Sequence, residues 1–220
     1  MTLPLRLFRC AFATGLLTAV AMLCAGGFAP PALVRYLLVY AISDLVSTLV
    51  ISPALANERN HPPAEGIDPG VRLLASLLFV ATVALGALDV GRIHWTLPIP
   101  RGVQLVALVV FVASSALQMW AMAVNAFFST ELRIQQEFGH RLITNGPYRW
   151  IRHPGYLAML LSLPSTAIAL GSRLALIPAA MYAGLILFRV RREDRYLLSN
   201  LPGYAEYING APNRLIPGIW

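Results

Sequence analysis

The chain has 220 residues, of which 57% are hydrophobic and only 12% are charged, and its mean hydropathy is +0.65. Soluble domains carry about 25% charged residues, so this composition excludes an ordinary soluble domain and predicts an all-α integral membrane protein. The net charge of +7 rests on arginine, because the sequence contains no lysine. Arginine in such a chain is typical of loops at the cytoplasmic side of a membrane, and no segment resembles a nucleic-acid-binding module.

Apolar runs in the sequence predict five to six transmembrane helices, because a spanning helix needs about 20 apolar residues. Two shorter runs near the C-terminus are predicted to form a helical hairpin around Gly171-Ser172-Arg173. The apolar run at residues 33–54 is interrupted by the polar residues Ser43 and Asp44. If this run does not cross the membrane completely, the chain has five crossings. The predicted spans are residues 11–28, 33–54, 72–90, 103–128, 156–170 and 174–189, with a polar loop at 57–69.

Two features of the first spans allow more than one interpretation. Arg6 and Arg9 precede an apolar run that ends at Ala25-Gly26-Gly27, as in a secretory signal peptide. We interpret this run as a membrane helix, because it is long and another apolar segment follows at once. Asp44 lies within the second run, where an acidic residue is a functional candidate. Its serine and threonine neighbours favour a hydrogen bond between helices instead.

The distribution of arginine predicts the orientation of the chain. With six spans, all but four of the 17 arginines fall on one side of the membrane, together with both termini. The positive-inside rule places that side in the cytoplasm. We therefore expect an inner (plasma) membrane protein of bacterial type whose termini are cytoplasmic. The four arginines on the other side are Arg35, Arg92, Arg101 and Arg173.

The sequence offers little support for a disulfide, a metal site or a soluble-type nucleotide fold. Cys10 and Cys24 are the only cysteines, and on one helix they would lie about 21 Å apart, too far to bridge. His140 and His153 are thirteen positions apart and lack a convincing third ligand. Neither a GxGxxG pattern nor a P-loop occurs. We therefore expect no metal.

Two charged segments flank the C-terminal hairpin, which should bring them to the same end of a helix pair. The first, residues 139–156, reads GHRLITNGPYRWIRHPGY, and the second, residues 188–194, reads FRVRRED. Together they predict a polar pocket at the membrane surface, with Glu193 suited to a cationic ligand and Arg189 to an anionic one. Arg189 and Glu193 are four positions apart on one helix face, so their spacing alone also fits an ordinary surface ion pair.

The order of these motifs resembles the isoprenylcysteine carboxyl methyltransferase family, which belongs to a wider group with phospholipid N-methyltransferases. The resemblance rests on Gly146-Pro147-Tyr148-Arg149-x-x-Arg152-His153-Pro154-Gly155-Tyr156, then Arg189-x-x-x-Glu193-Asp194, then Pro202-Gly203-Tyr204-x-x-Tyr207. It covers residues 125–220 and is greatest to bacterial members. It implies a methyltransferase core at 125–220, with a cofactor-binding loop, a helical hairpin and an amphipathic tail. Residues 1–124 then form the N-terminal transmembrane helices.

The resemblance implies that the C-terminal half binds S-adenosylmethionine at the cytoplasmic surface. Arg189 matches the arginine placed near the substrate carboxylate, and we predict it as the catalytic residue. The chain departs from the family pattern at Asp194, which replaces a second glutamate, and at Arg192, which adds positive charge beside Glu193. The implied cofactor-binding residues are Gln135, His140, Arg141, Leu142, Ile143, Tyr148, His153, Pro154, Gly155, Tyr156 and Glu193.

The function implied is methyl transfer to a lipophilic acceptor that enters from the bilayer, either a small molecule or a lipidated substrate. A carboxylate acceptor fits best, because it is already ionised and needs no base, and phospholipid amines or thiols stay open. A membrane NADPH-dependent reductase of the sterol type carries a similar RHPxY-like segment, usually with an acidic residue soon after the tyrosine. This chain has Leu157-Ala158-Met159 there. A non-enzymatic accessory protein for membrane assembly or transport is the remaining alternative.

Overall fold

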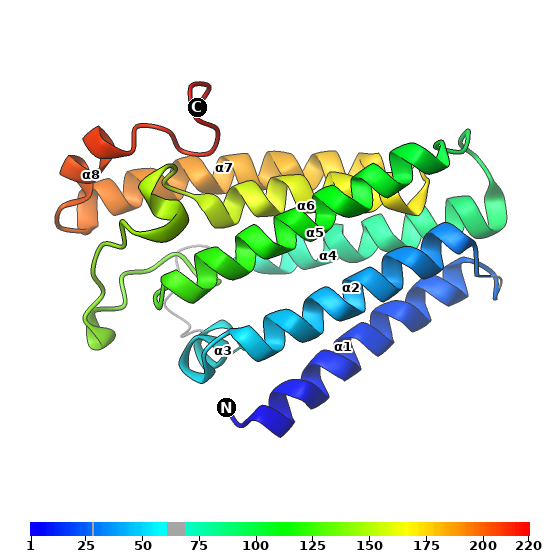
Figure 1. Cartoon of the computed structure of the whole chain (residues 1–220), viewed down its shortest axis with the longest axis horizontal. Coiled ribbons are helices and arrows are strands. Elements are labelled where there is room, and N and C mark those ends of the chain that lie inside the picture. Colours follow the sequence, from blue (N-terminus) through cyan, green and yellow to red (C-terminus); the bar gives the residue numbers. More distant parts are fainter. Residues whose placement is uncertain (28, 61–68) are drawn as a thin grey trace.

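The computed structural model describes residues 1–27, 29–60 and 69–220, and all regular elements within these residues are helical (Figure 1). The α-helices are α1 (Leu3–Cys24), α2 (Pro31–Val50), α3 (Pro53–Asn60), α4 (Pro69–Leu88), α5 (Arg101–Val124), α6 (Pro154–Leu170), α7 (Leu176–Asn200) and α8 (Tyr204–Gly210). A π-helical turn, η1 (Asp89–Ile93), extends α4, and two 3₁₀ turns, η2 (Gln136–Phe138) and η3 (Gly146–Arg149), lie between α5 and α6. The all-helical prediction is confirmed for this part of the chain.

The six long helices run up and down beside one another, so that the start of α1 and the end of α7 lie at the same end of the bundle (Figure 1). Helix α3, the loop between α5 and α6, and α8 also lie at this end, which we call the pocket end. Helix α5 packs along α6, and α4 packs against α1, α6 and α7. The predicted boundary between residues 124 and 125 coincides with the end of α5, and helices from both sides of it build one bundle.

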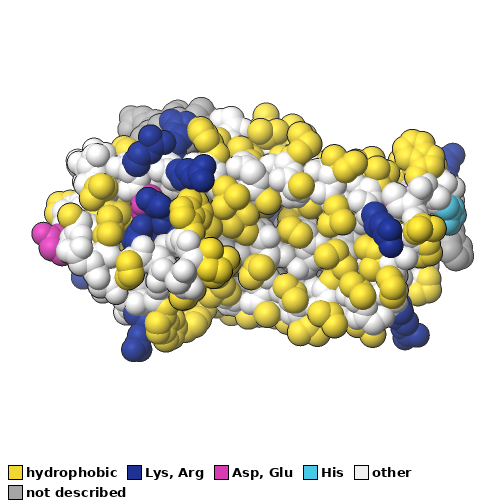
Figure 2. Space-filling model, turned by 90° about the horizontal axis from the view of Figure 1, so that it is seen from above, with side chains coloured by type: hydrophobic (Ala, Val, Ile, Leu, Met, Phe, Trp, Pro, Cys, Tyr) yellow, Lys and Arg dark blue, Asp and Glu magenta, His cyan; other side chains and the backbone are white. Residues whose placement is uncertain are grey.

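Four of the described helical segments are long and apolar enough to cross a membrane, as expected of an integral membrane protein. They are Leu3–Cys24, Pro31–Val50, Gly70–Ile93 and Arg101–Val124. Helix α6 is apolar but has only 17 residues, and α7 becomes charged in its second half. Figure 2 shows apolar side chains covering the length of the bundle, with arginines gathered mainly towards its ends.

The predicted helix boundaries need several corrections. Helix α2 ends at Val50 rather than at residue 54, and α5 ends at Val124 rather than at residue 128. Helix α1 begins at Leu3 rather than at residue 11, with a proline in its first turn, a position that proline favours. Helix α7 continues to Asn200 rather than ending near 189, so the second charged segment is helical throughout. Residues 57–60, predicted as loop, belong to α3, and the rest of that predicted loop, 61–68, lies outside the described residues.

Polar contacts join the first two helices within the membrane region. Asp44 of α2 accepts hydrogen bonds from the Thr14 hydroxyl at 3.0 Å and from the Cys10 thiol at 3.2 Å, both on α1. Its predicted role as a hydrogen-bonding post between helices is therefore confirmed. Arg6, near the start of α1, is buried and donates to the carbonyls of Thr48 and Ile51 at the end of α2. These contacts fix the pocket ends of α1 and α2.

The opposite end of the bundle is held by Asp89 of η1. This buried carboxylate accepts hydrogen bonds from the backbone and hydroxyl of Thr96 and, at 2.6 Å, from the Ser172 hydroxyl in the turn between α6 and α7. Gly91 lies close to α1, because a Cβ there would be 2.6 Å from the Cβ of Ala25. The bond to Ser172 anchors the C-terminal hairpin to η1 and α4. This anchor determines where the charged half of α7 lies.

Candidate active site

A cavity of about 670 Å³ opens at the pocket end and reaches into the membrane region of the bundle. Its polar half is lined by residues of the loop between α5 and α6 and by the charged part of α7. Its other half, which we call the apolar half, is lined mainly by apolar side chains of α2, α4, α5, α6 and α7, among them Tyr40, Phe79, Phe111, Met119, Met159 and Tyr182. The same helices also contribute the polar side chains of Ser43, Asp44, Ser47, Ser76, Ser115, Gln118 and Ser162. One continuous space therefore joins a charged surface site to an apolar interior.

The structure brings all but one of the predicted site residues to this cavity. Those that line it are His140, Arg141, Leu142, Ile143, Tyr148, His153, Pro154, Gly155, Tyr156, Arg189 and Glu193. The exception is Gln135, which is buried and does not line it. The Gln135 amide donates to the Phe127 carbonyl at 2.9 Å. Gln135 therefore shapes the loop, and its predicted contact with a cofactor has no support from its position.

His140 is held in place by a local fold of the loop. The backbone N–H of Gln135 donates to His140 Nδ1 at 3.2 Å, and the imidazole stacks on Phe127 with ring centres 4.5 Å apart. Between them η2 ends at Gly139, whose φ of 63° favours glycine. Because Nδ1 accepts this hydrogen bond, the neutral imidazole carries its hydrogen on Nε2. His140 therefore offers a hydrogen-bond donor within the cavity wall.

The NGPYR turn places Tyr148 between α5 and the C-terminal region. Gly146 begins η3 with φ 57°, and a Cβ there would meet Val124 at 2.8 Å, so the turn needs glycine on two grounds. The buried Tyr148 hydroxyl accepts a hydrogen bond from the Asn125 amide at 3.1 Å. The Tyr207 hydroxyl donates to the Tyr148 carbonyl at 2.5 Å. Tyr148 is thus fixed from both sides, with little freedom to move in the pocket.

Asp194 is the centre of a buried ionic network. The sequence showed only that this aspartate replaces a second glutamate of the family pattern, and it did not predict the network. Arg152 reaches both of its oxygens, with Nε at 2.9 Å from Oδ1 and Nη2 at 3.3 Å from Oδ2. Oδ1 also receives the Tyr204 hydroxyl at 2.8 Å and lies 3.1 Å from His153 Nε2. Oδ2 receives Arg214 Nε at 2.8 Å. Asp194 therefore joins α7 to the RHPGY motif, α8 and the C-terminal tail.

The network is charged in the folded protein. Burial alone would raise the pKa of Asp194, but the hydrogen bonds from His153, Arg152, Arg214 and Tyr204 outweigh it and hold this pKa well below the usual range. The backbone repeats the connection, since the N–H groups of residues 152 and 153 donate to the carbonyls of Asn213 and Arg214 at 3.0 and 2.9 Å. The motif is consequently clamped to the tail by side chains and main chain together.

Glu193, one position before Asp194, faces the cavity instead of the network. The Tyr156 hydroxyl donates to its Oε2 at 2.6 Å, and His153 Nδ1 lies 3.7 Å from its Oε1. The Glu193 side chain is 23% exposed, so it is accessible from the cavity and yet fixed in direction. Neighbouring positions on α7 thus differ in their surroundings: Asp194 joins parts of the fold, and Glu193 presents a carboxylate to the cavity.

Arg189 lies one helical turn from Glu193 and is only 7% exposed. Its Nη2 donates to the Thr130 carbonyl at 2.5 Å, while its Nε is buried without a hydrogen-bond partner. Among the described contacts there is no ion pair between Arg189 and Glu193, so the alternative of a surface ion pair is wrong. A buried guanidinium that lacks part of its hydrogen bonding is poorly satisfied by the protein alone. This arrangement suits an anionic ligand.

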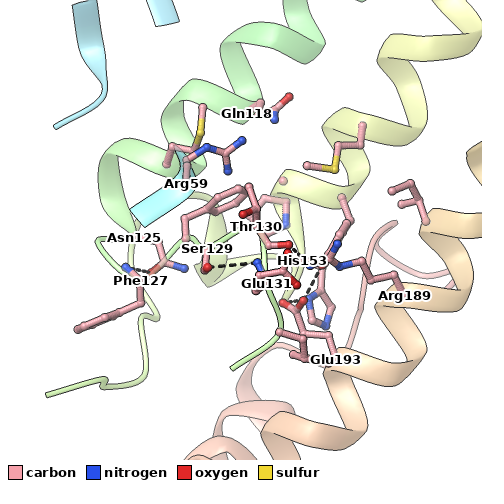
Figure 3. Close-up of a pocket in the computed structure, with 18 of the residues that line it drawn as sticks. Arg59, Gln118, Asn125, Phe127, Ser129, Thr130, Glu131, His153, Arg189 and Glu193 are labelled. Atoms are coloured by element: carbon pink, nitrogen blue, oxygen red, sulfur yellow. Dashed lines mark hydrogen bonds and ion pairs between the residues drawn. The ribbon is translucent and has the colours of Figure 1, made fainter. Parts of the chain in front are cut away.

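Three further residues of the cavity were missed by sequence reasoning. Glu131 is 7% exposed and lies 3.8 Å from Arg72, but its Oε2 has no partner, and neither does the Thr130 hydroxyl. Figure 3 shows Thr130, Glu131 and Arg189 close together in the pocket, with Arg59 of α3 above them. The sequence carried one signal for Glu131, because it is an acidic residue shortly after the predicted fourth span at residues 103–128. Nothing in the sequence pointed to Arg59.

Burial and the nearby positive charge of Arg133 lower the pKa of His140, although Glu193 and Glu137 oppose the shift. A lowered pKa in the folded state means that the unfolded chain takes up a proton first as the pH falls. Stability contributed by neutral His140 is therefore present above pH 6.5, its ordinary pKa, and is lost as the pH falls towards the folded-state value.

We predict that replacing His140 by Phe reduces the sensitivity of the protein to acid. Phe keeps the stacking on Phe127 but cannot be protonated, so the melting temperature should fall less below pH 6.5 than in the natural protein. Thermal melts of both proteins in detergent across this range measure the difference. Equal acid sensitivity of the two proteins would contradict the assignment of a neutral His140.

No group of three or more His, Cys, Asp or Glu side chains that could hold a metal ion occurs within residues 1–27, 29–60 and 69–220. The predicted pair His140 and His153 is used otherwise, since His140 accepts from the backbone and His153 bonds to Asp194. The buried polar atoms of the described cavity residues that lack partners are a guanidinium nitrogen, a hydroxyl and a carboxylate oxygen. Such a set suits an organic ligand carrying both charges.

Comparison with known proteins shows a similarity that spans most of this site. Residues 105–199, which run from α5 through the RHPGY motif to the end of α7, match the family model of isoprenylcysteine carboxyl methyltransferases. A curated relative, the cobalt-zinc-cadmium resistance protein CzcN of Cupriavidus metallidurans, is 37% identical over 86 residues. That match covers 37% of this chain and 38% of the relative. Over residues 105–199 the chain is therefore similar to the isoprenylcysteine carboxyl methyltransferase family, and the predicted resemblance is confirmed.

Proposed function

We propose that this protein is an integral membrane methyltransferase that uses S-adenosylmethionine to methylate a lipophilic acceptor. The single observation that carries the proposal is the continuity of the cavity. The residues of the family motif line its polar half, and apolar side chains of α2, α4, α5, α6 and α7 line the other. A water-soluble cofactor and a lipid-soluble acceptor can then meet in one space. Arg189 and Glu193 lie where the two halves join.

The polar half fits S-adenosylmethionine in charge and in shape. The cofactor is a zwitterion with a sulfonium, and when bound it supplies an electrophilic methyl group. The Glu193 carboxylate, fixed by Tyr156, suits the cationic part, and His140 and Arg141 supply donors on the facing loop. Gly155 allows the loop to pack closely, because a Cβ there would lie 2.5 Å from the Phe128 ring. These residues would hold the cofactor next to the apolar half.

A carboxylate acceptor is the proposal that the remaining groups support best. An ionised carboxylate needs no general base, so the protein has to align the acceptor oxygen with the methyl group and to exclude water. Arg189 supports this role, because its guanidinium is buried beside the cavity with Nε unpartnered. The apolar lining of α2, α4 and α5 suits a hydrocarbon chain attached to that carboxylate.

An amine acceptor is the second candidate, and Glu131 is the observation that favours it. Its buried Oε2 has no hydrogen-bond partner and faces the same cavity. A carboxylate in that position can bind an ammonium group and accept the proton that methylation of an amine requires. Replacing Glu131 by Gln separates the candidates, because it should abolish methylation of an amine and leave methylation of a carboxylate largely intact.

The orientation of the site follows the arginine distribution. The pocket end carries both termini and most of the arginines, and the positive-inside rule supports a cytoplasmic position for it. Cytoplasmic S-adenosylmethionine then has direct access to the polar half. To test this orientation, a cysteine is introduced at the exposed Glu206 of α8. Its reactivity towards a membrane-impermeant thiol reagent is then compared in intact cells and in inverted vesicles. The Cys10→Ala, Cys24→Ala protein serves as the background.

The proposed function predicts methyl transfer by the purified protein. Detergent-purified protein should transfer a labelled methyl group from S-adenosylmethionine to a component of a total lipid extract of the host. Mild alkaline hydrolysis of the product should release the label as methanol, because a carboxyl methyl ester is cleaved by base and an N-methyl amine is not. A labelled product stable to base would favour the amine. No labelled product from lipid or small-molecule extracts would count against a methyltransferase.

A further inference from the structure

The family match begins at residue 105, but the cavity is also lined by Arg59, on α3, which lies outside that match. The Arg59 side chain points into the pocket from the side opposite Arg189 (Figure 3). Its guanidinium lies over the Phe128 ring at 5.4 Å. The structure gives it no hydrogen bond and no carboxylate partner within the described residues. A charged group that enters a cavity without a partner is a candidate for ligand binding.

Arg59 is held in this direction by its neighbour. Glu58 accepts a hydrogen bond from the Ser129 hydroxyl at 2.8 Å, and its two oxygens bind Arg133 Nε at 3.2 Å and Nη2 at 2.9 Å. The Glu58 and Arg133 side chains are each only 11% exposed. This bidentate pair fastens α3 to the loop that forms the cavity wall. Arg59 is therefore positioned by a rigid contact and does not lie on a free surface helix.

The two arginines repel each other across the cavity. The positive charge of Arg189 adds to burial in lowering the pKa of Arg59 to about 10, with only a small opposing effect from Tyr156. Arg59 nevertheless stays protonated near neutral pH. Of the acidic groups on the cavity wall, Glu193 and Glu131 attract Arg189, and neither acts on Arg59. Glu131 also lies against Arg72, Glu193 is bound by Tyr156, and Asp44 is bound by α1. Two facing guanidinium groups without a shared carboxylate are stabilised when an anion lies between them.

We propose that Arg59 and Arg189 together bind the anionic headgroup of the lipophilic acceptor, with Arg59 as a specificity-determining residue supplied by the N-terminal half. The inference rests on the proposed function, since it names the chemistry of the acceptor at that same site. The buried Arg189 Nε without a partner provides one donor, and Arg59 provides the second cation. The aliphatic chain of the acceptor then extends into the apolar half of the cavity.

The same anion-binding pair could instead serve the amino-acid carboxylate of the cofactor, and the experiment distinguishes the two sources. Dissociation constants are measured with detergent-purified protein for dodecanoate, dodecyl phosphate, dodecanol and S-adenosylhomocysteine. The variants are Arg59→Gln, which removes the charge, and Arg59→Lys, which keeps it. Arg101→Gln, an exposed arginine at the opposite end of the bundle, is the matched control. Melting temperatures show whether each variant is folded.

The natural protein should bind dodecanoate or dodecyl phosphate more tightly than dodecanol. Arg59→Gln should weaken binding of the anionic probe by about tenfold or more, as expected for a charged hydrogen bond. It should change binding of dodecanol and S-adenosylhomocysteine by less than about twofold. Arg59→Lys should retain part of the preference, and Arg101→Gln all of it. If Arg59→Gln does not fold, the loss of preference is read from Arg59→Lys. Its shorter side chain and single point charge, in place of the planar guanidinium, should still weaken binding of the anionic probes.

Three results would overturn the inference. The first is unchanged affinity of Arg59→Gln for both anionic probes, and the second is a natural protein that binds dodecanol as tightly as the anions. The third is an equal loss of S-adenosylhomocysteine binding, which would assign Arg59 to the cofactor. Failure of the proposed function looks different, because the natural protein would then bind no S-adenosylhomocysteine while the Arg59-dependent preference for anions persists.

Discussion

Replacing Asp194 by Asn is expected to lower the melting temperature of the detergent-purified protein by about 10 °C or more. Asn has nearly the same shape but carries no charge, so Arg152 and Arg214 would lose their common counter-ion in a buried place. Removing one partner of a buried charge pair costs about 3–5 kcal/mol. The Asp194 side chain is only 6% exposed, so solvent screening offers little compensation.

The control for this prediction is Glu206→Gln, an equivalent change at an exposed residue of α8. It should alter the melting temperature by less than about 2 °C, because exposed charges away from a network contribute little. The acid dependence gives a second test. A lowered pKa of Asp194 means stability that is present above its ordinary pKa and lost as the pH falls through the folded-state value. Similar melting of Asp194→Asn and Glu206→Gln would contradict the network as a structural centre.

The second large effect is expected at Arg189, where we predict loss of transfer without loss of cofactor binding. Arg189→Ala should reduce methyl transfer to the acceptor of the natural protein by about 100-fold or more, as for removal of a group that aligns the reacting atoms. S-Adenosylhomocysteine binding should stay within about threefold of normal, because Glu193, His140 and the loop are intact. The measurement combines labelled-methyl transfer with calorimetric binding on the same preparation.

The matched control is Arg195→Ala, which removes an exposed arginine from the same helix, where its Nε donates to the carbonyl of Arg191. Its activity should be close to that of the natural protein. Arg189→Lys should recover part of the lost activity, since it restores the charge but not the planar donor pair. A proportional loss of binding and transfer in Arg189→Ala would show that Arg189 serves the cofactor or the fold, and not the acceptor.

The sequence predicted the positions of the long helices and the convergence of the two charged segments. Apolar runs predicted the number of long helices. A hairpin of two neighbouring helices returns the chain to the end where it started, and residues 139–156 and 188–194 flank such a hairpin. They were therefore expected to lie at the same end. Helix ends were less predictable. Leu3 starts α1 before the apolar run begins, and α7 continues through charged residues to Asn200 because its end packs on the loop and tail.

The roles of Asp194 and Arg59 could not be predicted, because each depends on partners that are distant in the chain. Asp194 collects side chains from positions 152, 153, 204 and 214, and no local spacing indicates such a network. Arg59 belongs to a short polar segment that predicts a loop, and the contacts of the neighbouring Glu58 with Ser129 and Arg133 hold that segment against the cavity wall. Gln135 shows the converse, because its resemblance to a ligand-binding position did not reveal that it points into the loop.

Binding of S-adenosylhomocysteine to the detergent-purified protein tests the central claim most directly. We predict that saturating ligand raises the melting temperature of the natural protein and that Glu193→Ala, which removes the carboxylate held by Tyr156, abolishes the increase. NADPH should have no effect on either protein, which separates a methyltransferase from a sterol-type reductase. An unchanged melting temperature of the natural protein with S-adenosylhomocysteine, or an increase with NADPH instead, would contradict a cofactor site for S-adenosylmethionine in this cavity.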